Sequence, residues 1–432
     1  MRKFRSLLAL ILAVLLLAGC ARQTAEPTAE PQLEETTEAE PTTEAAEPPT
    51  ETTEPPTEPP TEPTTEATEP PPPPIDHALL QSVIDQIAQE YRAMGLQVAV
   101  IRNGEIVGSY AYGWAIRDQV PMTVDHKIRV ASVTKVSVGI AALALHENGI
   151  LDINADIGPV WGVAARNPNF PDTPITPYLI LSHISSIAAY EEEPSSDYRS
   201  VLNRMNRAFW AVEPGVMDSW CYNNYAFRVL GMTLELAADK TMDQIMGQYF
   251  FDSMGIEAAY APGDLADPSM AANLYNYRTV VRNQYEQQRL HSPTTPGGNG
   301  AYFAGGLTIS AQDMAKLIAM LANDGMYDGK QYLKPETVAL MEAYNEEQLF
   351  KGSWQAHPLF FVPGMYDREE VYYHTGYGYG VYSCVCYDNA TGDGVVVLTT
   401  GATGYKDPYD ISQVCSKIND YVYHYLEDLR NQ

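Results

Sequence analysis

One segment of the chain is unable to fold compactly, and its position confines the folded part to the remainder. Residues 21–74 contain 14 Glu, 14 Thr and 15 of the 31 prolines, with no aromatic residue and no glycine. Such a segment buries too little apolar surface to offset the entropy that ordering costs. We therefore predict a disordered stalk over 21–74, which leaves 75–432 as one large domain or two closely packed subdomains.

The charge balance excludes one class of partner. The chain carries 27 Lys and Arg against 55 Asp and Glu, a net charge of −28, of which −13 belongs to residues 21–74. With the basic leader also set aside, residues 75–432 keep a charge of −18. A surface this acidic repels the phosphates of DNA and RNA. We therefore expect no nucleic-acid partner.

Residues 1–20 have the pattern of an export signal. Three basic residues within the first five precede an apolar run over 7–18, which is too short to span a membrane. The run ends in Leu17-Ala18-Gly19-Cys20, which resembles the lipobox of bacterial lipoproteins. This resemblance implies acylation of Cys20 and an extracytoplasmic protein anchored by lipid to the cell membrane. The alternative is an ordinary signal peptide that happens to end in cysteine.

The other four cysteines are Cys221, Cys384, Cys386 and Cys415. Export permits disulfides, but Cys384 and Cys386 lie two apart on one face of a predicted strand and are poorly placed to pair with each other. A bridge from one of them to Cys415 stays open. Because no second Cys or His cluster stands at ligand spacing, we predict no metal and no cofactor.

Apolar periodicity predicts similar elements at both ends of the folded part. The expected elements are a helix over 76–94, a hairpin of 96–101 and 106–112 turning at Asn103-Gly104, a hairpin of 381–387 and 395–400, and a helix over 411–429. A long, mostly helical middle separates them. We predict an α+β fold: an antiparallel sheet built from both ends of the domain with flanking terminal helices, and a mostly helical inserted subdomain across a cleft.

Candidate catalytic residues begin at Ser132 and Lys135. A helix-forming run over 136–148 follows, so we expect Ser132 at a helix N-terminus with Lys135 one turn along on the same face. A serine hydroxyl needs a base to become a nucleophile, and a helix N-terminus favours an oxyanion. Of ten lysines only Lys135 has Ser three residues before it. The spacing alone also fits an N-capping serine beside a solvated lysine.

A second segment suited to this chemistry contains Tyr222 and Asn224, in a loop before a predicted helix over 225–231. A phenol near a lysine ammonium is expected to have a lowered pKa and to relay protons. The Asn224 amide is suited to contact both a substrate carbonyl and the lysine.

A third segment is His374-Thr375-Gly376, which we expect to open a strand that leads to 379–387. A glycine there lets a substrate lie against the strand backbone. The backbone N–H of Tyr377 is then suited to be an oxyanion donor beside that of Ser132.

Taken in chain order, the three segments resemble the serine β-lactamase-like superfamily, in particular the branch of class C β-lactamases, D-alanyl-D-alanine carboxypeptidases, D-aminopeptidases and related esterases. The likeness covers 75–432 and extends to 181–185, 214–215 and 305–314. It implies the fold already predicted, with Ser132 as nucleophile, Lys135 as its base partner and Tyr222 as proton relay. It also implies that Asn224, His374, Thr375 and Gly376 bind substrate, and that His183 is structural.

The chain departs from the family pattern at two positions. His374 stands where the β-lactamase version generally has Lys, and Ser186 stands where relatives commonly have Gly. Because histidine is only partly charged near neutrality, we expect pH-dependent recognition of a carboxylate by His374. The departure favours peptides or esters over β-lactams as substrates.

The sequence thus predicts an exported, membrane-anchored serine hydrolase that forms an acyl-enzyme. Its expected substrates are D-amino-acid peptides of the cell wall, and hence peptidoglycan, or small esters. One alternative is a β-lactamase. The other is a catalytically silent, surface-anchored binding module, against which the presence of all the motif residues argues.

Overall fold

The computed structural model describes residues 73–187, 211–350 and 352–432. The predicted leader, Cys20 and nearly all of the predicted stalk lie outside the described residues. Within the described ranges, no helix combines the length and apolar character needed to cross a membrane.

A single antiparallel sheet organises the described chain, and its centre joins the two ends of the domain. Strand β1 lies between β16 and β2, so the first strand pairs with the last. In spatial order the sheet consists of β11 (Asn345–Phe350), β12 (Ser353–Gln355), β13 (Phe360–Val362), β14 (Val371–Gly378), β15 (Val381–Asp388), β16 (Asp393–Thr400), β1 (Gly95–Arg102), β2 (Glu105–Ile116) and β3 (Val120–Pro121).

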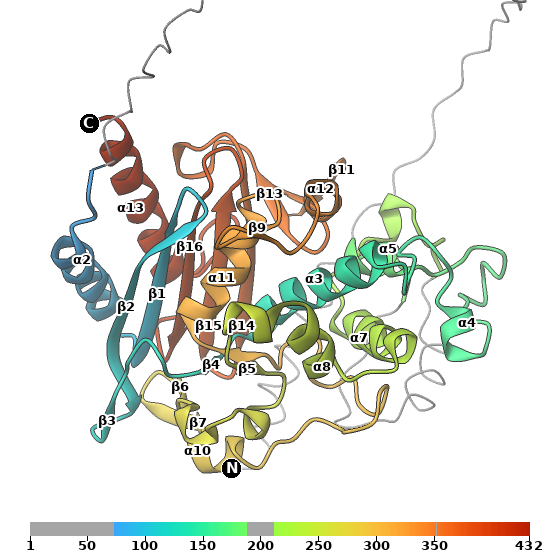
Figure 1. Ribbon diagram of the computed structural model, residues 1–432, viewed down its shortest axis with the longest axis horizontal. Helices are drawn as coiled ribbons and strands as arrows, with labels where there is room; N and C mark the ends of the chain where they lie inside the picture. Colours follow the sequence, from blue (N-terminus) through green and yellow to red (C-terminus); the bar gives the residue numbers. More distant parts are fainter. Residues whose placement is uncertain (1–72, 188–210, 351) are drawn as a thin grey trace, which may run out of the picture. The chain divides into compact units, whose positions relative to one another are not determined.

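Alternation along the central strands gives the sheet two buried faces. On β1, Leu96 and Val98 belong to one apolar cluster, whereas Ala99 and Ile101 belong to the other, as the period of two in a strand requires. The terminal helices α2 (His77–Glu90) and α13 (Gln413–Arg430) cover the first face, and α11 (Ala311–Leu321) covers the second (Figure 1). The predicted α+β fold is therefore confirmed.

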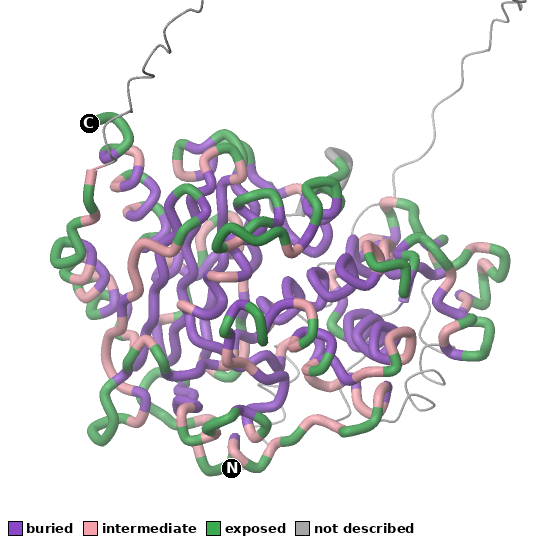
Figure 2. Tube along the Cα trace, viewed as in Figure 1, coloured by how far each residue is buried: buried purple, intermediate pink, exposed green. Residues whose placement is uncertain are grey.

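The helical part lies beyond the second face and is centred on α3 (Thr134–Glu147). This helix is apolar on all sides and buried from Thr134 to Leu145, because other helices surround it (Figure 2). Its neighbours include α7 (Asn224–Ala238) and α12 (Pro335–Glu342). The remaining helices named here are α4 (Gly158–Trp161), α5 (Pro177–Leu181), α8 (Met242–Met246), α9 (Asp252–Met254) and α10 (Gln284–Gln287).

Short strands connect the two parts. β4 (Ile128–Arg129) and β5 (Ala258–Ala259) both pair with β8 (Thr308–Ile309), which brings the segment before Ser132 beside the segment before α11. A small hairpin of β6 (Leu274–Asn276) and β7 (Thr279–Arg282) lies near β15 and β16. A second hairpin consists of β9 (Met326–Tyr327) and β10 (Lys330–Gln331).

The structure corrects two expectations. The strand predicted over 379–387 is interrupted, because Tyr379 and Gly380 have φ of +54° and +75° and form the tight turn between β14 and β15. His374 consequently lies inside β14 rather than at the start of a strand. The bridge to Cys415 that the sequence left open does not form, since Cys221, Cys384, Cys386 and Cys415 are all free thiols.

Candidate active site

Ser132 lies in a 3-10 turn, Ala131–Val133, that leads directly into α3. The preceding residue, Ala131, has φ of +49°, a conformation that costs an L-residue roughly 1 kcal/mol and that is typical of functional turns. Strand β14 holds this turn in place: a Cβ at Gly376 would lie 2.3 Å from the Val130 oxygen and 3.2 Å from the Ser132 nitrogen. Only glycine therefore allows the strand to approach the serine this closely.

Lys135 follows Ser132 by one turn and is fully buried. Its ammonium donates hydrogen bonds to Asn224 Oδ1 at 2.8 Å and to the Ala304 carbonyl at 2.9 Å. It also lies 4.8 Å from the ring centre of Tyr222 and 5.5 Å from that of Phe227. Segments from three distant parts of the chain thus hold one lysine nitrogen beside the serine turn.

Tyr222 links the lysine to the serine. Its phenol is hydrogen-bonded to the Ser132 side chain, and Asn223, the residue after it, caps α7 by accepting from the Ala226 N–H at 3.1 Å. The expected lowering of the Tyr222 pKa is wrong: burial raises that pKa, and the hydrogen bond with Ser132 offsets only part of the rise. The phenol is therefore neutral near pH 7.

His183 supports the Tyr222 loop. Its Nδ1 accepts the Asn223 N–H at 3.2 Å, its carbonyl accepts the Cys221 N–H at 2.9 Å, and its ring lies 4.6 Å from that of Tyr222. These contacts fit the structural role that the family resemblance implies for it. Ser186 has φ of +55°, a conformation in which glycine carries no steric penalty.

His374 differs from its predicted character. Its Nδ1 lies 2.7 Å from the Thr375 carbonyl; a carbonyl only accepts, so Nδ1 carries the proton and Nε2 is a bare acceptor with no partner in the described chain. Burial, together with the charge of Lys135, lowers the pKa of His374 to about 3. The predicted partial charge near neutrality, and the pH-dependent carboxylate recognition based on it, are therefore wrong.

The rest of the third segment lines an open edge of the sheet. β13 pairs with β14 only over Val371–Tyr373, whereas β15 pairs along its full length. The other edge of β14 from His374 to Gly378 is thus free of β13 and faces the serine turn through Gly376. Thr375 and Tyr377 lie on the same stretch, and Tyr377 is 62% exposed.

The structure therefore brings Ser132, Lys135, Tyr222, Asn224 and Gly376 to one place, with His374 buried behind them. Sequence reasoning missed the Ala304 carbonyl, because a backbone acceptor has no sequence signature of its own. The adjacent pair Gly305-Gly306 was the available signal: Gly305 packs against Ala131, where a Cβ would lie 3.5 Å from its carbonyl carbon.

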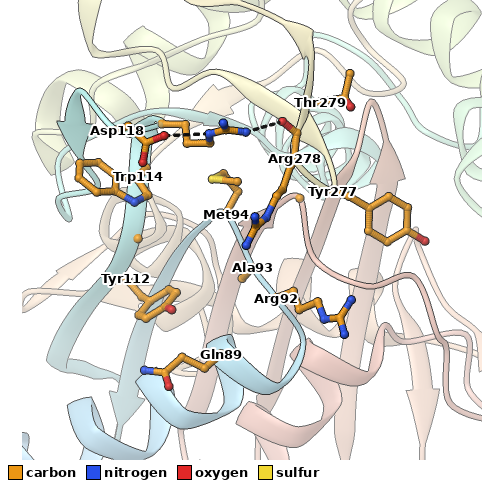
Figure 3. A pocket seen from close by; sticks show the side chains of 13 residues that line it. Gln89, Arg92, Ala93, Met94, Tyr112, Trp114, Asp118, Tyr277, Arg278 and Thr279 are labelled. Carbon is orange, nitrogen blue, oxygen red and sulfur yellow. Dashed lines mark hydrogen bonds and ion pairs between the residues drawn. The ribbon is translucent and has the colours of Figure 1, made fainter.

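The described chain also contains a cavity of about 700 Å³ that none of these residues lines. It opens beyond the end of α2, between β2 and the β6–β7 turn, and Arg92, Trp114 and Arg278 are among its lining residues (Figure 3). Arg117 donates there to Asp118 at 3.1 Å and to the Arg278 carbonyl at 3.2 Å. Within the described ranges, no three His, Cys, Asp or Glu residues are grouped so that they could hold a metal ion.

The beta-lactamase family model matches residues 80–413, so this chain belongs to the beta-lactamase family. It is 27% identical over 197 residues to a D-aminopeptidase of Brucella anthropi, covering 44% of this chain and 37% of that protein. It is 30% identical over 186 residues to esterase EstB of Burkholderia gladioli, covering 38% of this chain and 46% of that protein. The matches thus span less than half the length of either relative.

A solved structure agrees with this assignment at the level of the fold. The class C β-lactamase from Rhodobacter sphaeroides superposes with a TM-score of 0.61 over 82% of this chain and 98% of its own, at 19% sequence identity.

Proposed function

We propose that this chain is a serine hydrolase that acts through an acyl-enzyme formed on Ser132. One observation supports this proposal most: the buried Lys135 lies against the ring of Tyr222, whose phenol is hydrogen-bonded to Ser132. A nucleophile in contact with a proton relay, which a third group orients, is the arrangement that covalent acyl transfer needs. A catalytically silent module has no need to keep a buried lysine there.

The proposed reaction has two steps. Ser132 Oγ forms a bond to the substrate carbonyl carbon while its proton passes through Tyr222 toward Lys135. The C–N or C–O bond of the substrate then breaks, and the leaving group takes that proton. Water adds to the acyl-enzyme in the second step and restores the serine hydroxyl. The backbone N–H groups of Ser132 and Tyr377 are the proposed oxyanion donors.

The proposed substrates are D-amino-acid peptides of the cell wall or small esters. The free edge of β14 beside Ser132 suits an extended peptide, which adds to a sheet edge as a further strand. The D-aminopeptidase and esterase relatives favour the same two classes. β-Lactam hydrolysis stays a second candidate because the family fold includes class C β-lactamases.

We further propose that the protein is exported and anchored by lipid at Cys20. The basic flank, the short apolar run and the small residues before this cysteine support that location. The stalk over 21–74 then holds the domain away from the membrane, because repeated Pro-Thr-Glu units favour an extended chain.

Labelling with a fluorophosphonate or a fluorescent penicillin tests the proposed nucleophile. We expect the wild type to be labelled and Ser132→Ala to lose the label, because only the acylated Oγ retains the probe. Ser82→Ala removes an exposed serine on α2 and is the matched control, which we expect to label normally. Persistent labelling of Ser132→Ala at an unchanged melting temperature contradicts the assignment. Turnover of D-Ala-D-Ala peptides, nitrophenyl esters and nitrocefin then distinguishes the substrate classes.

A further inference from the structure

An acidic domain that acts on a carboxylate-bearing substrate needs a local positive charge, and the predicted source is not available. His374 is neutral near pH 7, and Lys135 is buried against Asn224 and Ala304. Lys406 lies over the ring of Tyr377 at 5.4 Å, but Asp410 neutralises it at 2.8 Å. A cation facing the mouth of the site must come from elsewhere.

Two arginines lie on the ring of Tyr379, in the turn that ends β14. The guanidinium carbon of Arg129 is 4.6 Å from the ring centre, and that of Arg282 is 5.3 Å from it. Arg282 is exposed, and within the described ranges it forms no ion pair with a carboxylate. Two cations that share one ring repel each other, and an anion bound between them removes that repulsion.

This cluster adjoins the serine turn. Arg129 precedes Ser132 by three residues and donates to the Gly305 carbonyl at 2.6 Å, and Gly305 itself packs on Ala131. Tyr379 follows Gly378, where a Cβ would lie 4.0 Å from the Cβ of Ala131. Both sides of the cluster are therefore tied to the residue immediately before the nucleophile.

The backbone of Tyr379 is a second, independent sign of function. Its φ of +54° belongs to a region that glycine and asparagine adopt readily and that costs a bulky residue roughly 1 kcal/mol. The side chain is 43% exposed, so burial of the ring in the core does not explain why tyrosine stands there. Its contacts with the two arginines do.

We propose that Arg129 and Arg282, held on Tyr379, form a cationic rim that binds a free carboxylate of the substrate beside Ser132. The inference rests on the proposed hydrolase function and narrows its substrate class to acyl compounds with a carboxylate on the leaving-group or acyl side. A guanidinium binds a carboxylate through two parallel hydrogen bonds, and its charge does not vary over the physiological pH range.

The test compares two ligands that differ in one charge, N-acetyl-D-alanyl-D-alanine and its C-terminal amide. We expect the wild type to hydrolyse the acid with the higher kcat/KM. In Arg282→Gln the kcat/KM for the acid falls by about tenfold, mainly through KM, while the value for the amide stays unchanged. Tyr379→Asn keeps the turn conformation but removes the ring, and we expect the same selective loss.

Arg278→Gln is the matched control. Arg278 lies on the same hairpin, is exposed, and lines the cavity beyond α2 instead. Its substitution changes the net charge of the domain equally, so a similar loss in both variants reveals a general field effect and overturns the rim. Equal losses on acid and amide in Arg282→Gln, or no wild-type preference for the acid, also overturn it.

Binding separates this inference from the hydrolase proposal. If the wild type hydrolyses neither compound, the proposed function fails on these substrates, and calorimetric binding to Ser132→Ala judges the rim alone. Tighter binding of the acid than of the amide, lost in Ser132→Ala/Arg282→Gln but kept in Ser132→Ala/Arg278→Gln, supports the rim. Equal binding of acid and amide overturns it.

Discussion

Gly376 is the residue through which strand β14 reaches the serine. A side chain at this position meets the Val130 oxygen, the Ser383 hydroxyl and the Ser132 nitrogen. The Ser383 hydroxyl also donates to the Val130 oxygen at 2.7 Å, so β15 holds the same peptide from behind. The placement of Ser132 therefore depends on the absence of one methyl group.

We predict that Gly376→Ala impairs acylation. The added Cβ must push β14 away from the serine turn, and a displacement of about 1 Å at a catalytic group costs on the order of 100-fold in rate. Gly378→Ala, two residues on, places its Cβ 4.0 Å from the nearest atom outside its neighbours and is expected to behave like the wild type. The rate of labelling by the fluorophosphonate measures both; equal rates contradict this account of Gly376.

At the scale of elements, α12 is joined to β15 through a buried carboxyl. Glu342, the last residue of the helix, accepts hydrogen bonds from the Tyr387 phenol at 2.9 Å and from Asn389 at 3.0 Å. Burial raises the pKa of Glu342 to about 8, from an ordinary value of 4.5. The carboxyl is thus protonated in the folded protein at a pH where the unfolded chain has released the proton.

This linkage predicts a pH-dependent stability. Between pH 4.5 and 8 the folded state holds a proton that the unfolded state lacks, so the free energy of unfolding falls as pH rises, by up to about 1.4 kcal/mol per unit. In Glu342→Gln the side chain is always neutral, and we expect a shallower decline over this range. Urea unfolding from pH 5 to 8 measures it, with the exposed Glu336→Gln as control; parallel curves for Glu342→Gln and wild type contradict the role of this carboxyl.

At the scale of the whole molecule, the fold brings both ends of the domain into one sheet and one helical layer. α2 packs on β2 and on α13, and the Pro73 carbonyl accepts from Arg102 at 2.8 Å. The chain therefore enters the domain at the end of β1, on the sheet part of the molecule, whereas Ser132 lies where the sheet meets the helical part.

The proposed anchor is a property of the whole molecule and predicts its location. We expect the wild type to take up radiolabelled fatty acid and to partition with membranes. Cys20→Ala, which removes the acceptor thiol, is expected to lose both the label and the membrane association while keeping fluorophosphonate reactivity. Cys221→Ser removes a different thiol and controls for the number of cysteines. Lipid labelling that survives in Cys20→Ala contradicts the anchor.

Much of the fold follows from local patterns in the sequence. Alternation and the Asn103-Gly104 turn correctly predict β1 and β2, and apolar periodicity predicts α2 and α13 to within a few residues at each end. These signals are local, because a strand or helix that packs on one core face must show its own period. The turn at Tyr379 escaped prediction since tyrosine is uncommon at positive φ.

The sequence by itself determined which elements form, where the motif residues stand along the chain, and that residues 75–432 carry most of the apolar surface. Only the tertiary structure decided their electrostatic state and their neighbours. His374 is neutral and Tyr222 has a raised pKa because segments far away in the chain bury them, and Arg129 meets Arg282 only through the ring of Tyr379. Solvation and charge are set by whatever packs around a group, and that is a property of the folded chain.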